Sequence, residues 1–125
     1  MDYLQQRVRQ FHKAFDIPIA KKPSELSVNA VTRRMNLIHE ESEELFAALS
    51  VGDIVETADA IGDLLYVVYG TAVECGIDMY EINREIHRSN MTKVGGHKRE
   101  DGKWVKPDNY SPANLAPIIE KQLKE

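Results

Sequence analysis

The feature that most constrains this chain is a long acidic stretch without a basic side chain. Between Met35 and Asn83 there is no lysine and no arginine, yet these 49 residues hold 11 of the 20 acidic residues. Carboxylates on a helix normally have basic neighbours three or four residues away. If these acids are buried together, another positive charge must neutralise them, and a divalent cation is the obvious candidate.

The length suits one ordinary domain, and we expect a single domain over residues 1–125 with its core at about 27–93. The 42% of hydrophobic residues exclude a disordered chain and are enough to bury a core. Because Cys75 is the single cysteine, no intrachain disulfide can form, which favours a reducing, cytoplasmic location.

Charge and hydropathy predict neither a nucleic-acid nor a membrane partner. The net charge of −4 provides no global basic field for nucleic acid. The longest apolar-rich stretch, 61–73, is shorter than a membrane span and contains Asp63. The first residues have no apolar signal core.

Hydrophobic spacing and capping residues predict an all-α fold. Ser27 is a suitable N-cap for the second helix and Asp53 for the third, while Gly52 and Gly76 suit the turns that follow the second and third helices. The expected helices run over about 2–15, 27–50, 54–75 and 79–90. Because the connection at Gly52-Asp53 is short, the second and third helices should pack antiparallel as a hairpin.

Beyond the fourth helix we expect a polar tail rich in glycine and proline. Asp101-Gly102 can turn a small hairpin, although its flanks alternate poorly. A short last helix is expected from Pro117 to Leu123, with proline at its first position.

Several acids of the hairpin lie where a solvated helix would not place them. On the second helix Glu41 falls inside an apolar arc that includes Leu37 and Leu45, with Glu44 and Glu40 at its edge. On the third helix one narrow face carries Glu56, Asp59 and Asp63.

The hairpin register should bring these acidic edges together. Glu44 comes level with Asp59, and Glu40 and Glu41 with about Asp63. Carboxylate oxygens are the ligands that Mg²⁺ prefers, and Mn²⁺ accepts the same donors. The predicted ligands are Glu41, Glu44, Glu56, Asp59 and Asp63. The remaining acids, Glu43, Glu74, Asp78 and Glu81, are expected to be solvated or to cap helices.

Residues 40–45 (Glu-Glu-Ser-Glu-Glu-Leu) and 59–66 (Asp-Ala-Ile-Gly-Asp-Leu-Leu-Tyr) resemble the all-α NTP pyrophosphatase superfamily. Its members include MazG-like proteins and phosphoribosyl-ATP pyrophosphohydrolase. The pattern is Glu-Glu-x-x-Glu on one helix and Glu-x-x-Asp on the next. The matching residues are Glu40, Glu41, Glu44 and Asp63.

One position departs from this pattern. The glutamate expected three residues before Asp63 is replaced by Ala60. Asp59 lies one residue earlier, and Glu56 with Asp59 forms a Glu-x-x-Asp of its own. Either places a substitute carboxylate on the face of Asp63, so the choice between them stays open.

The resemblance implies hydrolysis of a nucleoside triphosphate between its α and β phosphates. Mg²⁺ held by the acids would neutralise the phosphate oxygens. Glu40 and Glu41 are the catalytic candidates, with Glu40 favoured to activate water. Family members are dimers or dimers of dimers. Since the third helix is apolar on more faces than one hairpin can cover, we expect a homodimer or homotetramer with a four-helix core.

Basic groups must also reach the phosphates. Asn90 and Lys93, near the end of the fourth helix, are the candidates for substrate binding, together with Arg88. Trp104 is expected to pack on the bundle or on a second subunit, and stacking on a base is the alternative.

Other functions fit less well. A di-iron carboxylate bundle would need Glu-x-x-His motifs, and none of the four histidines has a glutamate three residues before it. An EF-hand needs loop spacing rather than helical spacing. Phosphoribosyl-ATP hydrolysis in histidine biosynthesis and a non-catalytic regulatory module on the same fold stay as alternatives. The Ala60 departure and the extended tail favour nucleotide house-cleaning.

Overall fold

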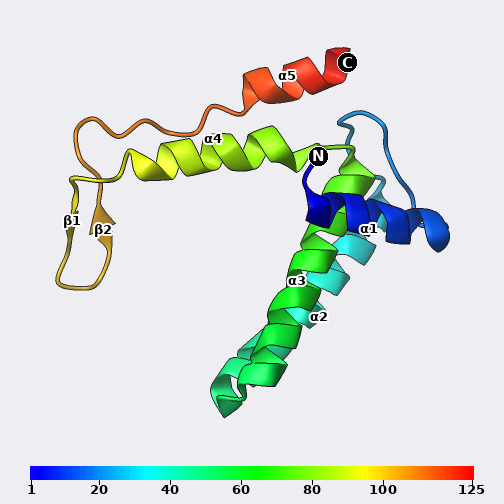
Figure 1. Cartoon of the computed structure of the whole chain (residues 1–125), viewed down its shortest axis with the longest axis horizontal. Helices are drawn as coiled ribbons and strands as arrows, with labels where there is room; N and C mark the ends of the chain where they lie inside the picture. The colour runs from blue at the N-terminus through cyan, green and yellow to red at the C-terminus, as the bar shows by residue number, and fades with distance from the viewer. The chain divides into compact units, whose positions relative to one another are not determined.

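The computed structural model describes all 125 residues and confirms the all-α prediction (Figure 1). The helices are α1 (Tyr3–Ala14), α2 (Val28–Val51), α3 (Ile54–Cys75), α4 (Met79–Met91) and α5 (Ala116–Lys124). A two-stranded antiparallel sheet pairs β1 (His97–Lys98) with β2 (Trp104–Val105). The chain divides into two compact units, Met1–Asp78 and Met79–Glu125.

The helix ends of the first unit are set by the residues that the sequence indicated. The Ser27 hydroxyl accepts a hydrogen bond from the Ala30 amide at 3.2 Å, at the start of α2. The Asp53 carboxylate accepts the Val55 amide at 2.9 Å and so begins α3. Gly52 lies between the two helices with φ 79°, a left-handed conformation that glycine adopts without strain. The α2–α3 hairpin therefore has its expected bounds.

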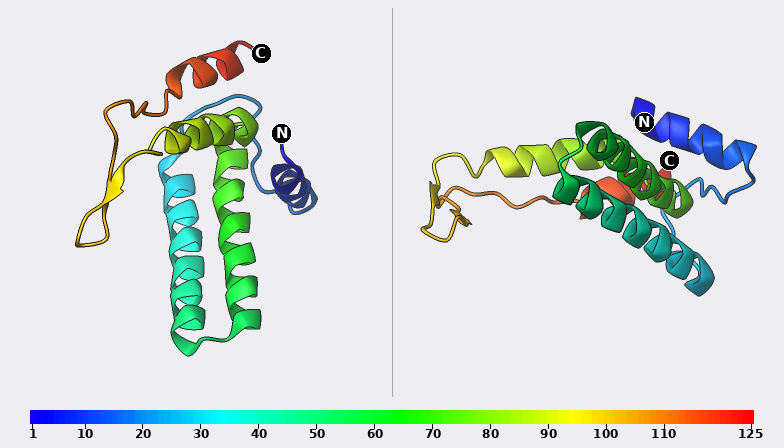
Figure 2. Two further views of the ribbon diagram at one scale, coloured as in Figure 1. Left: turned by 60° about the vertical axis from the view of Figure 1, so that its left-hand side comes forward. Right: turned by 90° about the horizontal axis from the view of Figure 1, so that it is seen from below.

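α2 and α3 run antiparallel along their length, and α1 packs against α3 (Figure 2). The Phe11 ring of α1 meets the Tyr66 ring edge-on, with centroids 5.5 Å apart. The Tyr69 hydroxyl donates to Asp2, and the buried Gln5 amide donates to the Ile77 carbonyl at 2.6 Å. These contacts anchor the N-terminal helix on α3 near its C-terminal end.

A buried charge network joins α2 to α3. Arg34 is only 5% exposed, and its Nη1 donates to Glu74 Oε2 at 2.9 Å. Its other nitrogens donate to the Val67 carbonyl at 2.8 Å and the Thr71 hydroxyl at 3.2 Å. Arg33 donates to the second carboxylate oxygen of Glu74. The guanidinium of Arg34 is thus fully paired inside the first unit.

The expectation that Glu74 is solvated or a cap is wrong. Its side chain is 1% exposed and lies against two arginines. Both of these arginines precede the stretch without basic residues, so sequence neighbours gave no sign of the pairing.

Gly70 makes room for this network. A Cβ at Gly70 would lie 2.4 Å from Arg34 Nη2 and 3.0 Å from His12 Nε2. His12 is buried, and its Nδ1 donates to the Pro18 carbonyl at 3.1 Å. Burial lowers the pKa of His12 against the opposing effect of that hydrogen bond, and the Arg34 charge lowers it further. His12 therefore packs as a neutral ring.

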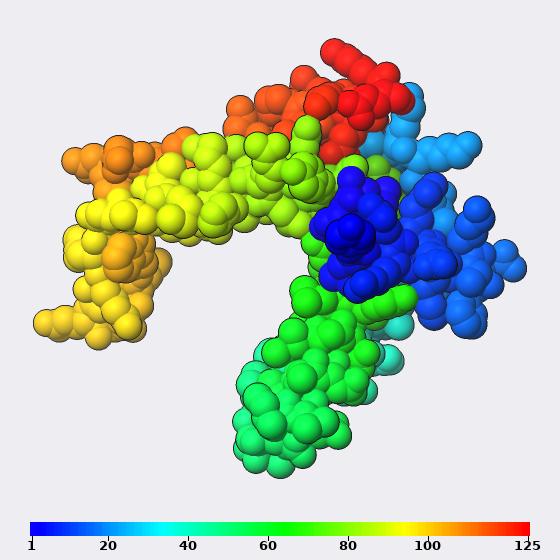
Figure 3. All heavy atoms as spheres, viewed as in Figure 1, coloured from blue at the N-terminus to red at the C-terminus, as the bar shows by residue number.

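The second unit consists of α4, the small hairpin and α5, with the hairpin at one end of it (Figure 3). Arg88 pairs with Glu85 and also donates to the Ser111 hydroxyl at 3.2 Å. This pairing and the Asn114 amide lower the pKa of Glu85 to about 2. The Ser89 hydroxyl donates to the Ser111 carbonyl at 2.8 Å, which fastens the tail to α4.

No single helix is long and apolar enough to cross a membrane. Only α3 and α4 taken as one bent pair would have the length and apolar composition of a membrane span.

Glu74→Gln should lower the free energy of unfolding by about 3 kcal/mol, because it leaves the buried Arg34 without its counter-charge. Urea unfolding followed by circular dichroism measures the loss. Glu81→Gln is the control, since it breaks an exposed pair with Lys121 and should change stability little. Equal effects of the two substitutions would contradict the assigned role of Glu74.

Candidate active site

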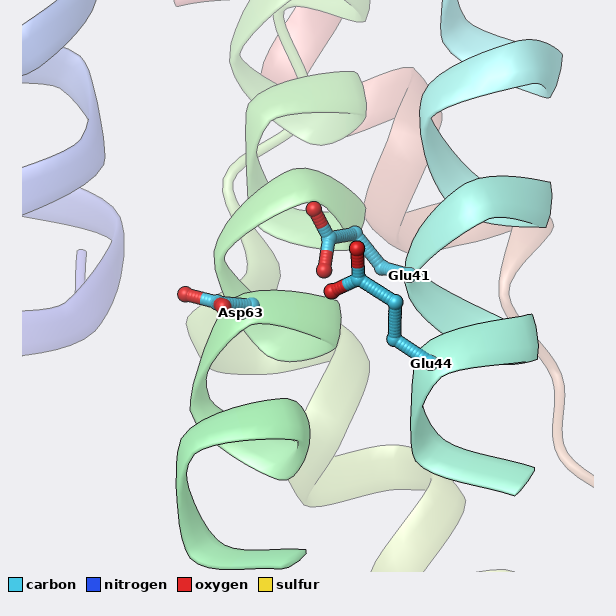
Figure 4. A group of neighbouring side chains, drawn as sticks. All are labelled: Glu41, Glu44 and Asp63. Atoms are coloured by element: carbon cyan, nitrogen blue, oxygen red, sulfur yellow. The ribbon is translucent and has the colours of Figure 1, made fainter. Parts of the chain in front are cut away.

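Three carboxylates from the two hairpin helices converge in the first unit (Figure 4). Glu41 and Glu44 come from α2 and Asp63 comes from α3. One oxygen of each lies within 4.8 Å of the others. The cluster confirms the part of the expected register that brings Glu41 to Asp63 across the hairpin, and Glu40 is not part of it.

Glu41 is the least exposed member of this cluster. It is half-buried, and its Oε2 is shielded from solvent without any hydrogen-bond partner. Burial raises the pKa of Glu41, and the charge of Glu44, a hydrogen bond with the Glu44 side chain and the charges of Asp63 and Glu40 raise it further. A carboxylate in this position is costly to ionise unless a cation joins it.

The cluster fits a hard divalent cation such as Mg²⁺. All its donors are carboxylate oxygens, and no lysine, arginine or histidine forms an ion pair with any of them. The buried Glu41 oxygen without a partner is the atom that a bound cation would satisfy. Glu44 and Asp63 are exposed, which leaves the solvent side open to water or phosphate oxygens.

An open groove of about 460 Å³ continues from the cluster toward the hairpin turn. Glu44, Glu56 and Asp59 line it, together with the buried Ala60. Glu56 and Asp59 thus share a groove with Glu44, while the close triad itself consists of Glu41, Glu44 and Asp63. Ala60, which stands where the family pattern has a glutamate, therefore lines this groove.

Glu40 and Glu43 occupy different positions on α2. Glu40 is exposed and outside the triad, but its charge contributes to the raised pKa of Glu41. Glu43 is exposed and lies 3.5 Å from His39 Nε2. Glu43 therefore serves as a natural control for the acids of the cluster.

The candidates for substrate binding lie in the second unit. Asn90 and Lys93 line a groove of about 390 Å³ with Trp104, a residue that the sequence analysis expected to be packed against the bundle or a second subunit. The Gly95-Gly96 pair could have indicated that Trp104 lies beside Lys93, because two glycines let the chain turn back at this point. Arg88 instead pairs with Glu85 and the tail, so its guanidinium is already engaged.

Comparison with known proteins identifies the family. A model of the phosphoribosyl-ATP pyrophosphohydrolase family matches residues 8–90. The chain belongs to this family. The family is part of the all-α MazG-like NTP pyrophosphatase superfamily, so the resemblance noted in the sequence is confirmed. The matched segment includes the triad, the groove acids and Asn90.

One relative is an uncharacterized protein of Acanthamoeba polyphaga mimivirus, 36% identical over 78 residues. The match covers 59% of this chain and 31% of the relative, so the chain spans less than a third of that protein's length.

Mg²⁺ should stabilise the protein through the triad. At a free concentration 100 times the dissociation constant, the free energy of unfolding should rise by about 2.7 kcal/mol over that in EDTA. Glu41→Gln should abolish most of this gain, and it should stabilise the metal-free protein because it relieves carboxylate repulsion. Urea unfolding with and without Mg²⁺ tests both effects. Glu43→Gln should respond like the wild type, and an undiminished gain in Glu41→Gln would exclude the assigned site.

Proposed function

We propose that the chain is a Mg²⁺-dependent nucleoside triphosphate pyrophosphohydrolase that converts NTP or dNTP to the monophosphate and pyrophosphate. Nucleotide-pool house-cleaning is the proposed role. The observation that carries this proposal is the triad itself, with one buried, unpartnered Glu41 oxygen at its centre. Membership of a pyrophosphohydrolase family supports the reaction class.

The acidic residues have two different roles in the proposed site. Glu41, Glu44 and Asp63 would hold the ion, and Glu56 and Asp59 extend the acidic lining along the groove. When bound, Mg²⁺ neutralises phosphate oxygens and favours departure of pyrophosphate. Manganese, with the same preference for oxygen donors, should substitute.

Glu40 is the proposed general base. It is exposed beside the triad without belonging to it, so its carboxylate remains free to accept a proton. The water oxygen then bonds to phosphorus, the α–β anhydride bond breaks, and pyrophosphate leaves.

A second candidate substrate is phosphoribosyl-ATP, which the name of the matching family favours. It contains the same α–β phosphoanhydride, so the triad would serve it equally. Ala60 in the groove lining and the tail beyond Gly95 are the features that favour house-cleaning instead.

Pyrophosphate release from a panel of canonical and modified NTPs and dNTPs, with phosphoribosyl-ATP included, tests the proposal. Release should require Mg²⁺ or Mn²⁺ and should fall at least about 100-fold in Glu41→Gln, because a metal ligand is lost. Glu43→Gln should keep wild-type turnover. If no compound is cleaved by folded protein that still binds Mg²⁺, the regulatory module becomes the better explanation.

The same assay separates the general base from the ligands. Glu40→Gln should lower kcat by about 100-fold or more while the stabilisation by Mg²⁺ persists, because proton acceptance is lost and the ligands remain. Wild-type turnover of Glu40→Gln at saturating Mg²⁺ would remove Glu40 from this role.

We also propose that the hairpin assembles into a homodimer or homotetramer with a four-helix core. Large apolar side chains of α2 and α3 are exposed in the single chain: Phe46, Leu49, Ile61, Leu65 and Val68. A soluble monomer rarely exposes so many neighbouring apolar groups, and a second copy would cover them.

Light scattering tests this assembly. At micromolar concentration the mass should be at least twice the 14.2 kDa of one chain. Leu65→Glu should lower the mass, because a charge would be buried in the interface. A wild-type mass of a single chain would contradict the proposed assembly.

A further inference from the structure

The second unit contains a groove lined by Asn90 and Lys93, the residues that the sequence predicted to bind substrate. It measures about 390 Å³ and is lined by the C-terminal end of α4, the turn that follows and the hairpin. Its aromatic wall is Trp104, the only tryptophan of the chain, which remains 45% exposed. This volume lies within the range of small-molecule sites.

The indole ring is held in place by its own surroundings. Its Nε1 donates to the Lys93 carbonyl at 2.9 Å. Gly96 lies so close that a Cβ there would be 2.7 Å from the indole Nε1 and 2.1 Å from the Val105 carbonyl. The polar edge of the ring is therefore satisfied within the unit, and the ring surface that stays exposed is apolar.

The polar groups beside the ring are uncommitted. The Lys93 ammonium and the Asn90 amide form no ion pair or side-chain hydrogen bond. Residues 93–106 contain five lysine or arginine residues against two acids, of which Asp101 is already paired with Arg99. An aromatic surface next to free positive charge matches a ring that carries an anionic group.

We propose that this groove binds a nucleotide through its base. The base stacks on Trp104, the Asn90 amide hydrogen-bonds with the edge of the base, and the Lys93 ammonium pairs with a phosphate. The inference rests on the proposed function for its ligand class, because a nucleotide is the substrate proposed for the enzyme.

A single-stranded nucleic acid fits the groove less well. Such strands are bound by successive aromatic side chains along a basic track. Here one tryptophan is exposed, and the ring of Tyr110 in the tail lies under the Lys106 ammonium at 4.4 Å. The net charge of −4 also opposes a polyanion.

Because Trp104 is the only tryptophan, its fluorescence reports on this groove alone. The experiment titrates the full chain with AMP, GMP, CMP and UMP in EDTA, where no phosphoanhydride is present and no metal is bound. We expect saturable quenching by at least one nucleotide and little change with ribose 5-phosphate. Lys93→Met should weaken binding about tenfold. Lys103→Met should not weaken it, because Lys103 lies in the β1–β2 hairpin beside Trp104 but does not line the groove.

Trp104→Tyr, checked for folding by circular dichroism, provides a second variant, and calorimetry should show weaker binding to it. Absence of quenching, equal quenching by ribose 5-phosphate, or far tighter binding of an oligonucleotide would overturn the inference. So would an indole that acrylamide cannot reach in the assembled protein, since a second copy would then cover it.

The pyrophosphate assay keeps the two proposals apart. Turnover without nucleotide quenching contradicts only the base-binding groove. Quenching without turnover contradicts only the proposed hydrolysis.

Discussion

The buried pairing of Arg34 with Glu74 is the interaction on which the hairpin depends. It crosses from α2 to α3, and Arg34 also binds the Val67 carbonyl and Thr71 on successive turns of α3. Because one guanidinium bonds to three positions, α2 cannot slide along α3 without breaking several buried hydrogen bonds. Glu41 lies two helical turns beyond Arg34, so the same contacts set its level against Asp63.

The acids of the hairpin thus meet two opposite environments. Glu74 is buried, and the positive charges of two arginines neutralise its carboxylate. Glu41 is half-buried among other acids, and no basic side chain pairs with it. The two carboxylates therefore differ above all in their neighbours, which are arginines for Glu74 and acids for Glu41.

Local signals predicted most of the fold. Ser27, Asp53 and Gly52 act within a few residues of their own position, so the helix bounds could be predicted without tertiary information. Glu41 was also recognisable, because an acid inside an apolar arc is visible in the sequence. Glu74 was not, since its partners lie 40 and 41 residues away. The contacts of Arg88 with the tail are hidden in the same way, because Ser111 lies 23 residues further on.

The buried network of Arg34 and Glu74 restricts which residue can stand at position 70. Gly70 carries no chemistry and belongs to neither groove, yet any side chain there would displace the guanidinium that sets the hairpin register. A substitution at this position should therefore disturb the level of Glu41 against Asp63 even where every acidic residue is intact. The acids of the motif therefore depend on a residue outside the motif, because the small volume at position 70 leaves room for the guanidinium of Arg34.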